Sequence, residues 1–483
     1  MNVVIVGGGI IGQCIAFYVA QNKNIKIQHL YPASESGLGT SAAAAMLNSI
    51  AEVDAYSLAS EHSRALFECS LHATAEWQNF LQVLSEANPS QSFHNGISEF
   101  GMGEVQTESG GGTYVLHNTV SSDLDYENFQ AIKSVAKEYE LEVEECQPSV
   151  ISGYKPEARS RATESLHIRS EGWLNPNHII SAIATTLAEQ ENYSRIDGYV
   201  DRLEIQSGRI LSVTTREGKE LGADYVVLAN GVFLNDLVTR SNAREIIPHY
   251  VYSGVGCAIE VAADFSDIRN CIRTPNRGGA CGLYVVPYGG HEGNNHHYII
   301  GASNYISLAP GFRPRAISVA HLLQAAADEI NQEFYRAEIL NLKVGNRPLT
   351  FDQYPLIGQT FCDNLLMANG TRRDGFHMAP VIASFIRNAI ESKEDPLFDF
   401  FSPMRKPIID ISYENGIQQN VANLISEAFQ HGYKPATVRG YEQFHSSITR
   451  EVEDTHEKFC KSEYGIPPLM YKLAKGGLIN DPR

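Results

Sequence analysis

The hydrophobic residues near the N-terminus change their spacing twice within one short segment. Residues 3–6 are an uninterrupted apolar run, which is typical of a buried strand. A cluster of glycines follows, and over residues 10–21 the apolar positions recur with the spacing of a helix. Residues 25–29 then alternate between apolar and polar positions, as in a second strand. The order strand, glycine turn, helix, strand predicts a β-α-β unit with parallel strands.

Helical and strand-like spacing alternate along the rest of the chain. Helical spacing predicts helices over residues 52–84, 126–139, 177–189, 317–334 and 377–390. Strand-like patterns cover residues 93–116, 199–215, 225–229, 251–301 and 364–368. The glycine-rich insertion and the long run of strands interrupt the β-α-β pattern, which indicates a second, antiparallel-sheet domain inserted into the first.

The sequence therefore predicts an α/β fold in three parts. A Rossmann-type nucleotide-binding domain is expected over residues 1–90, 150–245 and 338–392. The inserted substrate domain is expected over residues 91–149 and 246–337. Residues 393–483 form a C-terminal extension with a helical apolar stripe that ends at Gly432. Three roles stay open for this extension: covering the site, making a homo-oligomer contact, or binding a partner protein.

Composition narrows the possible partners. The formal net charge is −18, which disfavours nucleic acids and anionic membranes because both attract basic surfaces. The hydrophobic fraction of 43% and the charged fraction of 19% are those of a globular protein. No stretch reaches the roughly 20 apolar residues that span a bilayer, and the apolar N-terminus lacks the basic segment of a signal peptide. We expect a cytoplasmic protein that acts on a small molecule.

The cysteines and histidines do not suggest a metal site. The eight cysteines are scattered and form no Cys-x-x-Cys pair, which argues against a zinc site or a dithiol centre and fits a reducing compartment. His291, His296 and His297 lie in a hairpin rich in glycine and asparagine, without a set of cysteines or carboxylates. No metal is predicted.

The first glycine cluster is the motif Gly7-x-Gly9-x-x-Gly12, with Ile11 inside it. Glycines at these positions let backbone amides approach a pyrophosphate at the positive end of a helix. Its place between a strand and a helix favours dinucleotide binding over a purely structural turn. An acidic residue usually follows the second strand and binds the ribose, but this chain has Tyr31 there, a neutral hydrogen-bonding partner.

A second segment of small residues makes the pattern more specific. Residues 39–47, GTSAAAAML, resemble the second flavin-contact segment of the family of glycine oxidase, D-amino-acid oxidase and sarcosine oxidase. Members of this family bind FAD on a glutathione-reductase-like domain and oxidise amino acids, and small residues let the main chain pass beside the flavin. The resemblance departs at Ala45, where glycine oxidases have glycine. It implies that FAD contacts Thr40, Ser41, Ala45 and Met46.

Further segments match this family in the same order over nearly all of residues 1–392. Tyr284 matches a tyrosine that faces the substrate, and Arg347 lies in a GNRP segment whose arginine binds the substrate carboxylate. No cysteine stands near this segment, where the related sarcosine oxidases attach flavin, so noncovalent FAD is expected. The other implied cofactor contacts are Val200, Gly231, Gly370, Arg372, Arg373, Asp374, Gly375 and Phe376.

Several of these residues have a second interpretation. The planar guanidinium of Arg347 suits a carboxylate, although an arginine in a sheet is also a common structural ion-pair partner. The resemblance implies that Arg373 makes a polar contact near the substrate. The neighbouring Arg372 could make this contact instead. Tyr284 fits the core equally well, and Lys343 either approaches the flavin through a water or is a surface charge.

The resemblance implies a reaction in which hydride leaves the α-carbon for flavin N5 and the resulting imine hydrolyses. Positioning is expected to supply most of the acceleration, and a helix starting near Gly375 would stabilise the reduced ring. An NAD-dependent dehydrogenase would not need the segment 39–47, and a noncatalytic flavin-binding protein would not need Arg347 and Arg373. The substrate side chain and the electron acceptor, whether oxygen, a quinone or a protein, stay open.

Overall fold

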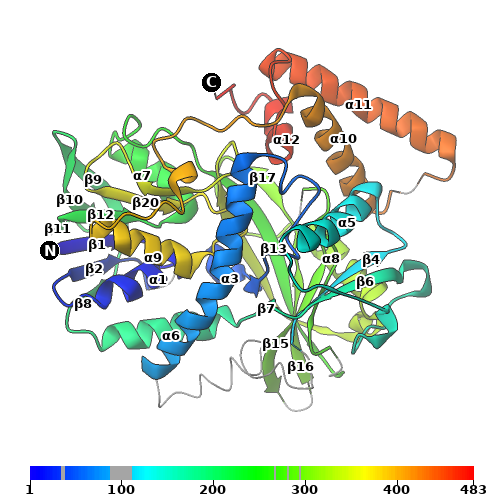
Figure 1. Ribbon diagram of the computed structural model, residues 1–483, viewed down its shortest axis with the longest axis horizontal. Coiled ribbons are helices and arrows are strands. Elements are labelled where there is room, and N and C mark those ends of the chain that lie inside the picture. The colour runs from blue at the N-terminus through cyan, green and yellow to red at the C-terminus, as the bar shows by residue number, and fades with distance from the viewer. Residues whose placement is uncertain are drawn as a thin grey trace.

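Two large β-sheets with helices packed against them form the computed structural model (Figure 1). The structure describes residues 1–33, 38–87, 111–265, 268–279, 282–292, 295–433 and 435–482. The first sheet has six strands, and all neighbours run parallel except β19 and β20. In spatial order they are β19 (Leu356–Gln359), β20 (Leu365–Asn369), β12 (Tyr225–Leu228), β1 (Asn2–Val6), β2 (Lys26–Leu30) and β8 (Tyr193–Ile196).

The glycine turn between β1 and α1 (Ile10–Ala20) allows the strand and the helix to approach each other closely. Gly7 has a φ of +123°, a conformation that residues with a side chain rarely adopt. A Cβ on Gly12 would lie 2.0 Å from the carbonyl oxygen of Gly7. Gly9 is the N-cap of α1, whose first backbone amides have no partner within the helix.

Helical and sheet layers cover both faces of this sheet. The side chains of Val3 and Ile5 point to one face, where four helices pack around the fully buried Trp77. Val4 and Val6 point to the other face, which a helix and a small three-stranded sheet cover. The first layer is α1, α3 (Glu61–Ala87), α6 (Pro176–Ala188) and α9 (Ala379–Ile390). The second is α7 (Leu234–Arg240), β9 (Val200–Gln206), β10 (Arg209–Thr215) and β11 (Glu220–Gly222).

The second large sheet has nine strands. Neighbouring strands are antiparallel except β14 and β4, which are parallel. Helices α5 (Asp123–Glu138) and α8 (Ala316–Glu329) pack against it. The strands are β17 (Tyr305–Ser307), β13 (Tyr252–Ala263), β16 (Asn295–Gly301), β15 (Tyr284–Glu292), β14 (Cys271–Arg273), β4 (Thr113–Asn118), β6 (Ala162–Ile168), β5 (Glu144–Cys146) and β18 (Glu338–Leu349), the last paired with β13.

The architecture is of the predicted α/β class, with two differences in the second sheet. The sheet is mixed rather than purely antiparallel, because β14 and β4 pair in parallel. It also includes β6 and β18, although the sequence assigned residues 150–245 and 338–392 to the nucleotide-binding domain. An alternating pattern shows that a strand exists but does not identify its partner. The division into three parts stays a prediction.

Two helices begin or end away from their expected positions. The helix expected from residue 52 begins at Glu61, because the Asp54 carboxylate accepts hydrogen bonds from the Tyr56 amide and the Ser57 hydroxyl and holds a turn. The helix expected over residues 317–334 ends at Glu329, before a short 3-10 helix. Most of the strand pattern expected over residues 93–116 lies outside the described residues, and β4 occupies its described end.

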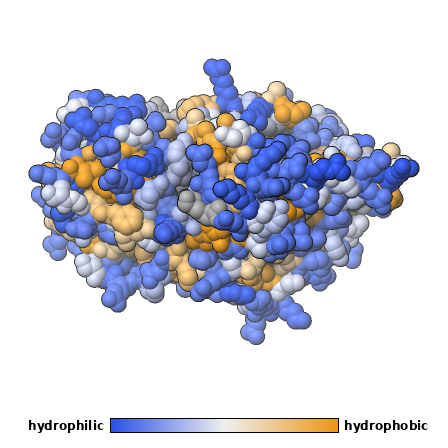
Figure 2. Space-filling view, turned by 90° about the horizontal axis from the view of Figure 1, so that it is seen from above, coloured by the Kyte–Doolittle hydropathy of each residue, from blue (hydrophilic) through white to orange (hydrophobic). Residues whose placement is uncertain are grey.

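The C-terminal extension folds as three helices, α10 (Tyr413–Gln430), α11 (Val438–Cys460) and α12 (Tyr471–Lys475) (Figure 1). Their apolar side chains pack with Tyr252 and Leu349 of the large sheet. Seen from above in Figure 2, the surface toward the end that carries α11 is mostly hydrophilic. Within the described ranges, no helix has both the length and the apolar composition needed to cross a membrane.

Candidate active site

A cavity of about 860 Å³ reaches from the glycine turn to the second sheet, and we call it the cofactor cavity. Its walls include residues 7–11, 38–40, 256–258 and 345–348. Both side-chain amide atoms of Asn230, in the same wall, are shielded from solvent and have no hydrogen-bond partner among the described residues. A cavity of this size that begins at a helix N-terminus and offers unpaired amide atoms fits a dinucleotide such as FAD.

Most of the residues expected to contact the cofactor line this cavity. They are Gly7, Gly9, Ile11, Tyr31, Thr40, Ala45, Met46, Val200, Gly231, Arg372, Arg373, Asp374, Gly375 and Phe376. Three expected contacts are not among the residues that line the cavity. Gly12 packs α1 against the strand end, the Ser41 hydroxyl donates to the Leu38 carbonyl at 3.2 Å, and Gly370 turns the chain after β20 with a φ of +70°. These three shape the wall, and their contact with a cofactor stays a prediction.

Tyr31 lies in the cavity wall at the end of β2, where its ring is fixed on several sides. The Arg195 guanidinium lies 4.6 Å from the centre of the ring, and the His29 ring centre lies 4.5 Å away. A Cβ on Gly8 would come within 2.4 Å of the Tyr31 ring. Packing on the glycine turn and a cation-π contact therefore hold the residue that stands in place of the usual acid.

His29, on β2, connects this strand to the glycine turn and to Tyr193 through its two ring nitrogens. Its Nε2 lies 2.8 Å from the carbonyl oxygen of Gly7, and its Nδ1 lies 3.2 Å from the Tyr193 hydroxyl. Burial lowers the pKa of His29 to about 4. The ring is therefore neutral at pH 7, with Nε2 donating to Gly7 and Nδ1 accepting from Tyr193.

We expect acid to destabilise the protein through His29. The unfolded chain protonates this ring at its ordinary pKa of 6.5, whereas the folded chain does so near 4. Unfolding therefore takes up a proton between these values, and the free energy of unfolding falls by about 3 kcal/mol as the pH drops from 6.5 to 4. Chemical unfolding at a series of pH values measures this loss.

The variant His29→Leu isolates this contribution. It should be less stable than the wild type at pH 7.5, but it should lose less stability on acidification. His72→Gln, an exposed position on α3, serves as the control and should keep the wild-type pH dependence. An unchanged pH slope in His29→Leu would show that another group is responsible.

The segment 38–47 follows the cavity as α2 (Gly39–Ala42) and then β3 (Met46–Leu47). The Thr40 hydroxyl accepts a hydrogen bond from the Ile10 amide at 3.0 Å and so caps the first turn of α1. Ala45 has a φ of +50°, the left-handed region that favours glycine. The backbone keeps this conformation with alanine at a cost of about 1 kcal/mol.

The second glycine junction leads into α9 through a turn rather than directly. The helix begins at Ala379 and not near Gly375, because residues 372–378 form turns and Pro380 enters the first helical turn. Within these turns Arg372 has a φ of +54°, and its amide donates to the Pro348 carbonyl at 2.7 Å. This conformation brings two consecutive arginines into the cavity wall.

Arg347 lies on β18 opposite two glycines of β13. It pairs in register with Gly254, and a Cβ on Gly256 would come within 2.2 Å of its Nη1. Nη1 donates to the Ser303 carbonyl at 3.2 Å and to Asn304 Oδ1 at 3.3 Å. No carboxylate among the described residues forms an ion pair with Arg347, so its charge is free for an anionic ligand. The Gly-x-Gly pattern at 254–256 leaves room for this side chain, but it was not among the motifs singled out in the sequence.

Arg373 is positioned by a buried network that the sequence did not reveal. Its Nη2 lies 3.2 Å from Glu52 Oε2, and the same carboxylate binds the fully buried Arg273. Although burial raises it, the charges of Arg273 and Arg373 hold the pKa of Glu52 below its ordinary value. Asn276 Oδ1 accepts from both arginines, at 3.0 Å and 3.4 Å. This network fixes the Arg373 side chain, whereas the Arg372 side chain hydrogen-bonds to Gln353 at 3.1 Å.

Tyr284 and Lys343 differ in their access to the cavity. Tyr284 is 3% exposed and lines the cavity, so it is both a core residue and a wall residue. Lys343 does not line the cofactor cavity and is not a surface charge, and its approach to the flavin through a water stays a prediction. Its Nζ lies 3.0 Å from the Tyr288 hydroxyl and 3.5 Å from Glu260, and its side chain is 9% exposed. It forms an ion pair on the same face of β13 and β18 as Arg347, because positions 343 and 347 lie on one face of a strand.

One cysteine lies closer to Arg347 than the sequence suggested. Cys257 belongs to β13, which pairs with the strand of Arg347, and it lines the cofactor cavity. Burial raises the pKa of its thiol, which keeps it protonated and weakly nucleophilic at neutral pH. Noncovalent binding of FAD stays a prediction.

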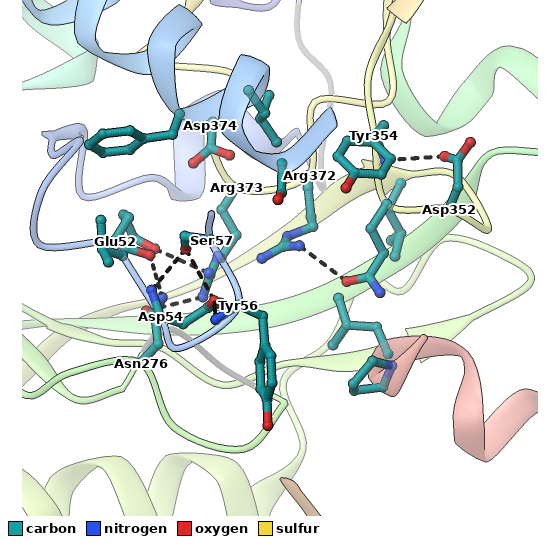
Figure 3. Close-up of a pocket in the computed structure, with 18 of the residues that line it drawn as sticks. Glu52, Asp54, Tyr56, Ser57, Asn276, Asp352, Tyr354, Arg372, Arg373 and Asp374 are labelled. Atoms are coloured by element: carbon teal, nitrogen blue, oxygen red, sulfur yellow. Dashed lines mark hydrogen bonds and ion pairs between the residues drawn. The ribbon is translucent and has the colours of Figure 1, made fainter. Parts of the chain in front are cut away.

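A smaller cavity of about 310 Å³ adjoins the cofactor cavity, and we call it the polar chamber (Figure 3). The two cavities share the wall residues Glu52, Arg347, Thr371, Arg372, Arg373 and Asp374. Figure 3 shows Arg372 and Arg373 side by side, between Asp374 and the loop of Asp54 and Tyr56. The extension supplies Asp410, Ile411, Asn415, Gln419, Asn423, Pro468 and Leu469 to the opposite wall.

Comparison with known proteins identifies the family. Residues 2–388 match the family described as DAO: FAD dependent oxidoreductase. The chain belongs to this family. The match confirms the predicted family, the oxidoreductase class and FAD as the cofactor, and it leaves the C-terminal extension outside.

Individual relatives agree with this membership. Glycine oxidase of Geobacillus kaustophilus (strain HTA426) is 24% identical over 398 residues, which are 81% of this chain and 93% of that protein. A crystal structure of glycine oxidase from Geobacillus kaustophilus has a TM-score of 0.67 at 22% identity, covering 83% of this chain and 98% of that chain. Iminodiacetate oxidase (IdaA) from Chelativorans sp. BNC1 has a TM-score of 0.64 at 16% identity, covering 83% and 99%. These structures confirm the fold.

Some relatives are much longer. The bifunctional protein ThiO/ThiG of Trichormus variabilis (strain ATCC 29413 / PCC 7937) is 28% identical over 241 residues, which are 48% of this chain and 34% of that protein. The match therefore spans about a third of the length of such bifunctional relatives.

Proposed function

We propose that this member of the DAO family oxidises the carbon–nitrogen bond of an amino acid or a related amine. The observation that carries the proposal is Arg347, an arginine without an acidic partner among the described residues, in the wall shared by the two cavities. An anionic group bound there lies at the edge of the cofactor cavity, and a carboxylate fits the planar guanidinium best. Glycine oxidase, a relative along most of the chain, supports an amino acid as the substrate.

The residues of the first sheet and of the segment 38–46 would hold the cofactor. The glycine turn and the capped N-terminus of α1 suit the pyrophosphate, and the unpaired amide of Asn230 offers both a donor and an acceptor. FAD, when bound, accepts the hydride from the carbon next to the nitrogen. The turn at 372–378 would lie at the edge of the ring.

The substrate residues act by binding and orientation. Arg347 makes two parallel hydrogen bonds with a carboxylate, which fixes the direction of the α-carbon as well as the affinity. Arg373, held by Glu52, adds positive charge beside this position. Tyr284 and the apolar residues around it, Ala44, Met46 and Ala302, exclude water from the reacting carbon. The imine product leaves this site and hydrolyses in water.

An anaerobic titration tests the proposal. The purified protein should show the absorbance of oxidised flavin, and one class among glycine, sarcosine, D- and L-amino acids and simple amines should bleach it. A flavin spectrum that every amine leaves unchanged would overturn amine oxidation. A colourless protein that takes up no added FAD would overturn the cofactor assignment as well.

A further inference from the structure

The walls of the polar chamber differ in charge. The walls shared with the cofactor cavity contain Arg347, Arg372 and Arg373 against two carboxylates. The walls that belong to the chamber alone contain three carboxylates, those of Asp54, Asp352 and Asp410, and one arginine. The chamber is therefore basic where it meets the cofactor cavity and acidic elsewhere.

Two of the charged residues on the acidic side are neutralised by partners behind the wall. Arg277 forms ion pairs with Asp125 at 3.0 Å and with Glu329 at 2.7 Å. Asp352 forms an ion pair with Arg405 at 3.1 Å and accepts a hydrogen bond from the Thr350 hydroxyl. Asp352 and Arg405 cancel each other, and Arg277 adds no positive charge because its two carboxylate partners outweigh it.

The charges of Asp54 and Asp410 are not neutralised in this way. Asp410 accepts hydrogen bonds from the hydroxyls of Tyr354, at 2.8 Å, and Ser60, at 2.5 Å. Asp54 accepts from the Tyr56 amide and the Ser57 hydroxyl. In the part of the chain that the structure describes, no lysine or arginine forms an ion pair with either carboxylate. His62 lies 3.8 Å from Asp410, and the Arg372 charge acts on Asp54 without a direct ion pair. Neutral donors orient these carboxylates but leave two negative charges for a ligand.

We propose that the polar chamber binds a distal cationic group of the substrate. The protein then prefers amino acids that carry a second amine or a guanidinium at the end away from the carboxylate. The carboxylate lies on Arg347, and the distal cation lies between Asp54 and Asp410. This inference rests on the proposed function, since it requires the reacting amine to lie in the cofactor cavity.

The rest of the chamber suits such a substrate. Apolar side chains in its lining fit a chain of methylene groups, and side-chain amides supply polar partners. A volume of about 310 Å³ accommodates an amino-acid side chain and excludes a macromolecule. The apolar residues include Leu66, Phe67, Ile306, Leu349 and Leu469, and the amides include Asn415, Gln419 and Asn423.

The inference also gives the C-terminal extension a role. Asp410 comes from the extension, which lies beyond the family match that ends at residue 388. The ion pair between Asp352 and Arg405 anchors the extension just before this residue. Of the three roles that the sequence left open, the extension then covers the site and selects the substrate.

Anaerobic flavin reduction in the holoenzyme tests the inference. Both enantiomers of lysine and ornithine are compared with norleucine, a neutral analogue of similar length, and with glutamate. The cationic amino acids should reduce the flavin at least about 10-fold more efficiently than norleucine, because a charged hydrogen bond contributes this much. Asp410→Asn should lower the efficiency with the cationic substrates by about 10- to 100-fold and leave norleucine within about 2-fold.

Matched variants separate this effect from damage to the fold. Asp399→Asn, at an exposed position of the extension, should keep the wild-type preference. If Asp410→Asn fails to fold, Asp54→Asn on the opposite wall replaces it, with the same expected loss. Equal or faster reduction by norleucine or glutamate, or an unchanged preference in these variants, would overturn the inference while the proposed function stands.

A second measurement separates the two claims. If no amine reduces the flavin, the proposed function fails, and binding is followed instead through the perturbation of the flavin absorbance. Tighter binding of lysine or ornithine than of norleucine, lost in Asp410→Asn, would still support the cationic chamber. Equal binding would overturn it.

Discussion

Replacing Arg347 by methionine should lower kcat/KM about 1,000-fold for the amine that reduces the flavin. On the proposed function, the variant loses two charge-assisted hydrogen bonds to the substrate carboxylate. Arg347→Lys restores the charge but not the planar guanidinium with its two parallel donors. Its kcat/KM should therefore stay about 100-fold below that of the wild type. Steady-state and anaerobic reduction kinetics measure both variants.

Two further variants test whether the loss depends on the position of the Arg347 guanidinium. Gly256→Ala keeps the arginine but places a Cβ 2.2 Å from its Nη1, so the displaced guanidinium should raise KM while the charge is retained. Arg216→Met removes an arginine that lies over the Tyr199 ring in the same cofactor cavity, and it should leave KM unchanged. If Arg347→Met retains more than a tenth of the wild-type kcat/KM with normal FAD content, Arg347 does not bind the substrate.

Replacing Gly12 by alanine should abolish FAD incorporation and lower the free energy of unfolding by about 3 kcal/mol. The added Cβ would lie 2.0 Å from the carbonyl oxygen of Gly7. The end of β1 and the start of α1 must separate to relieve this contact, which displaces the backbone amides proposed to hold the pyrophosphate. Flavin absorbance of the purified variant and chemical unfolding report the two effects.

Gly222→Ala is the matched control for this substitution. An added Cβ at Gly222, in β11 of the small sheet, meets nothing within 4 Å. We therefore expect full FAD content and a change in stability within about 0.5 kcal/mol. A stable, fully FAD-loaded Gly12→Ala protein would show that the strand and helix tolerate separation.

The sequence determined those features that depend on a few consecutive residues. The glycine turn was predictable because only glycine permits the φ of Gly7 and the contact at Gly12. The left-handed conformation of Ala45 likewise explains why the family places glycine at that position. Local backbone constraints of this kind can be read from the residue types. The GNRP segment with Arg347 is likewise recognisable from a few consecutive residues.

The sequence was less informative about where helices begin and about which strands pair. The turn held by Asp54 replaced the start of an expected helix, since a side chain that competes for backbone amides overrides helical spacing. Strands β6 and β18 joined the second sheet because strand partners are chosen by long-range packing. Cys257 came to lie beside the strand of Arg347 for the same reason.

Only the tertiary structure decided how the site is assembled. Glu52 binds Arg273 from 221 positions away in the chain, and Ser60 binds Asp410 from 350 positions away. No periodicity or spacing encodes such contacts, because each residue alone is compatible with a solvated surface and the pairing arises only when the two sheets and the extension pack together. The sequence by itself thus determined the family and its cofactor and singled out Arg347, whereas the polar chamber and its acidic wall exist only in the folded chain.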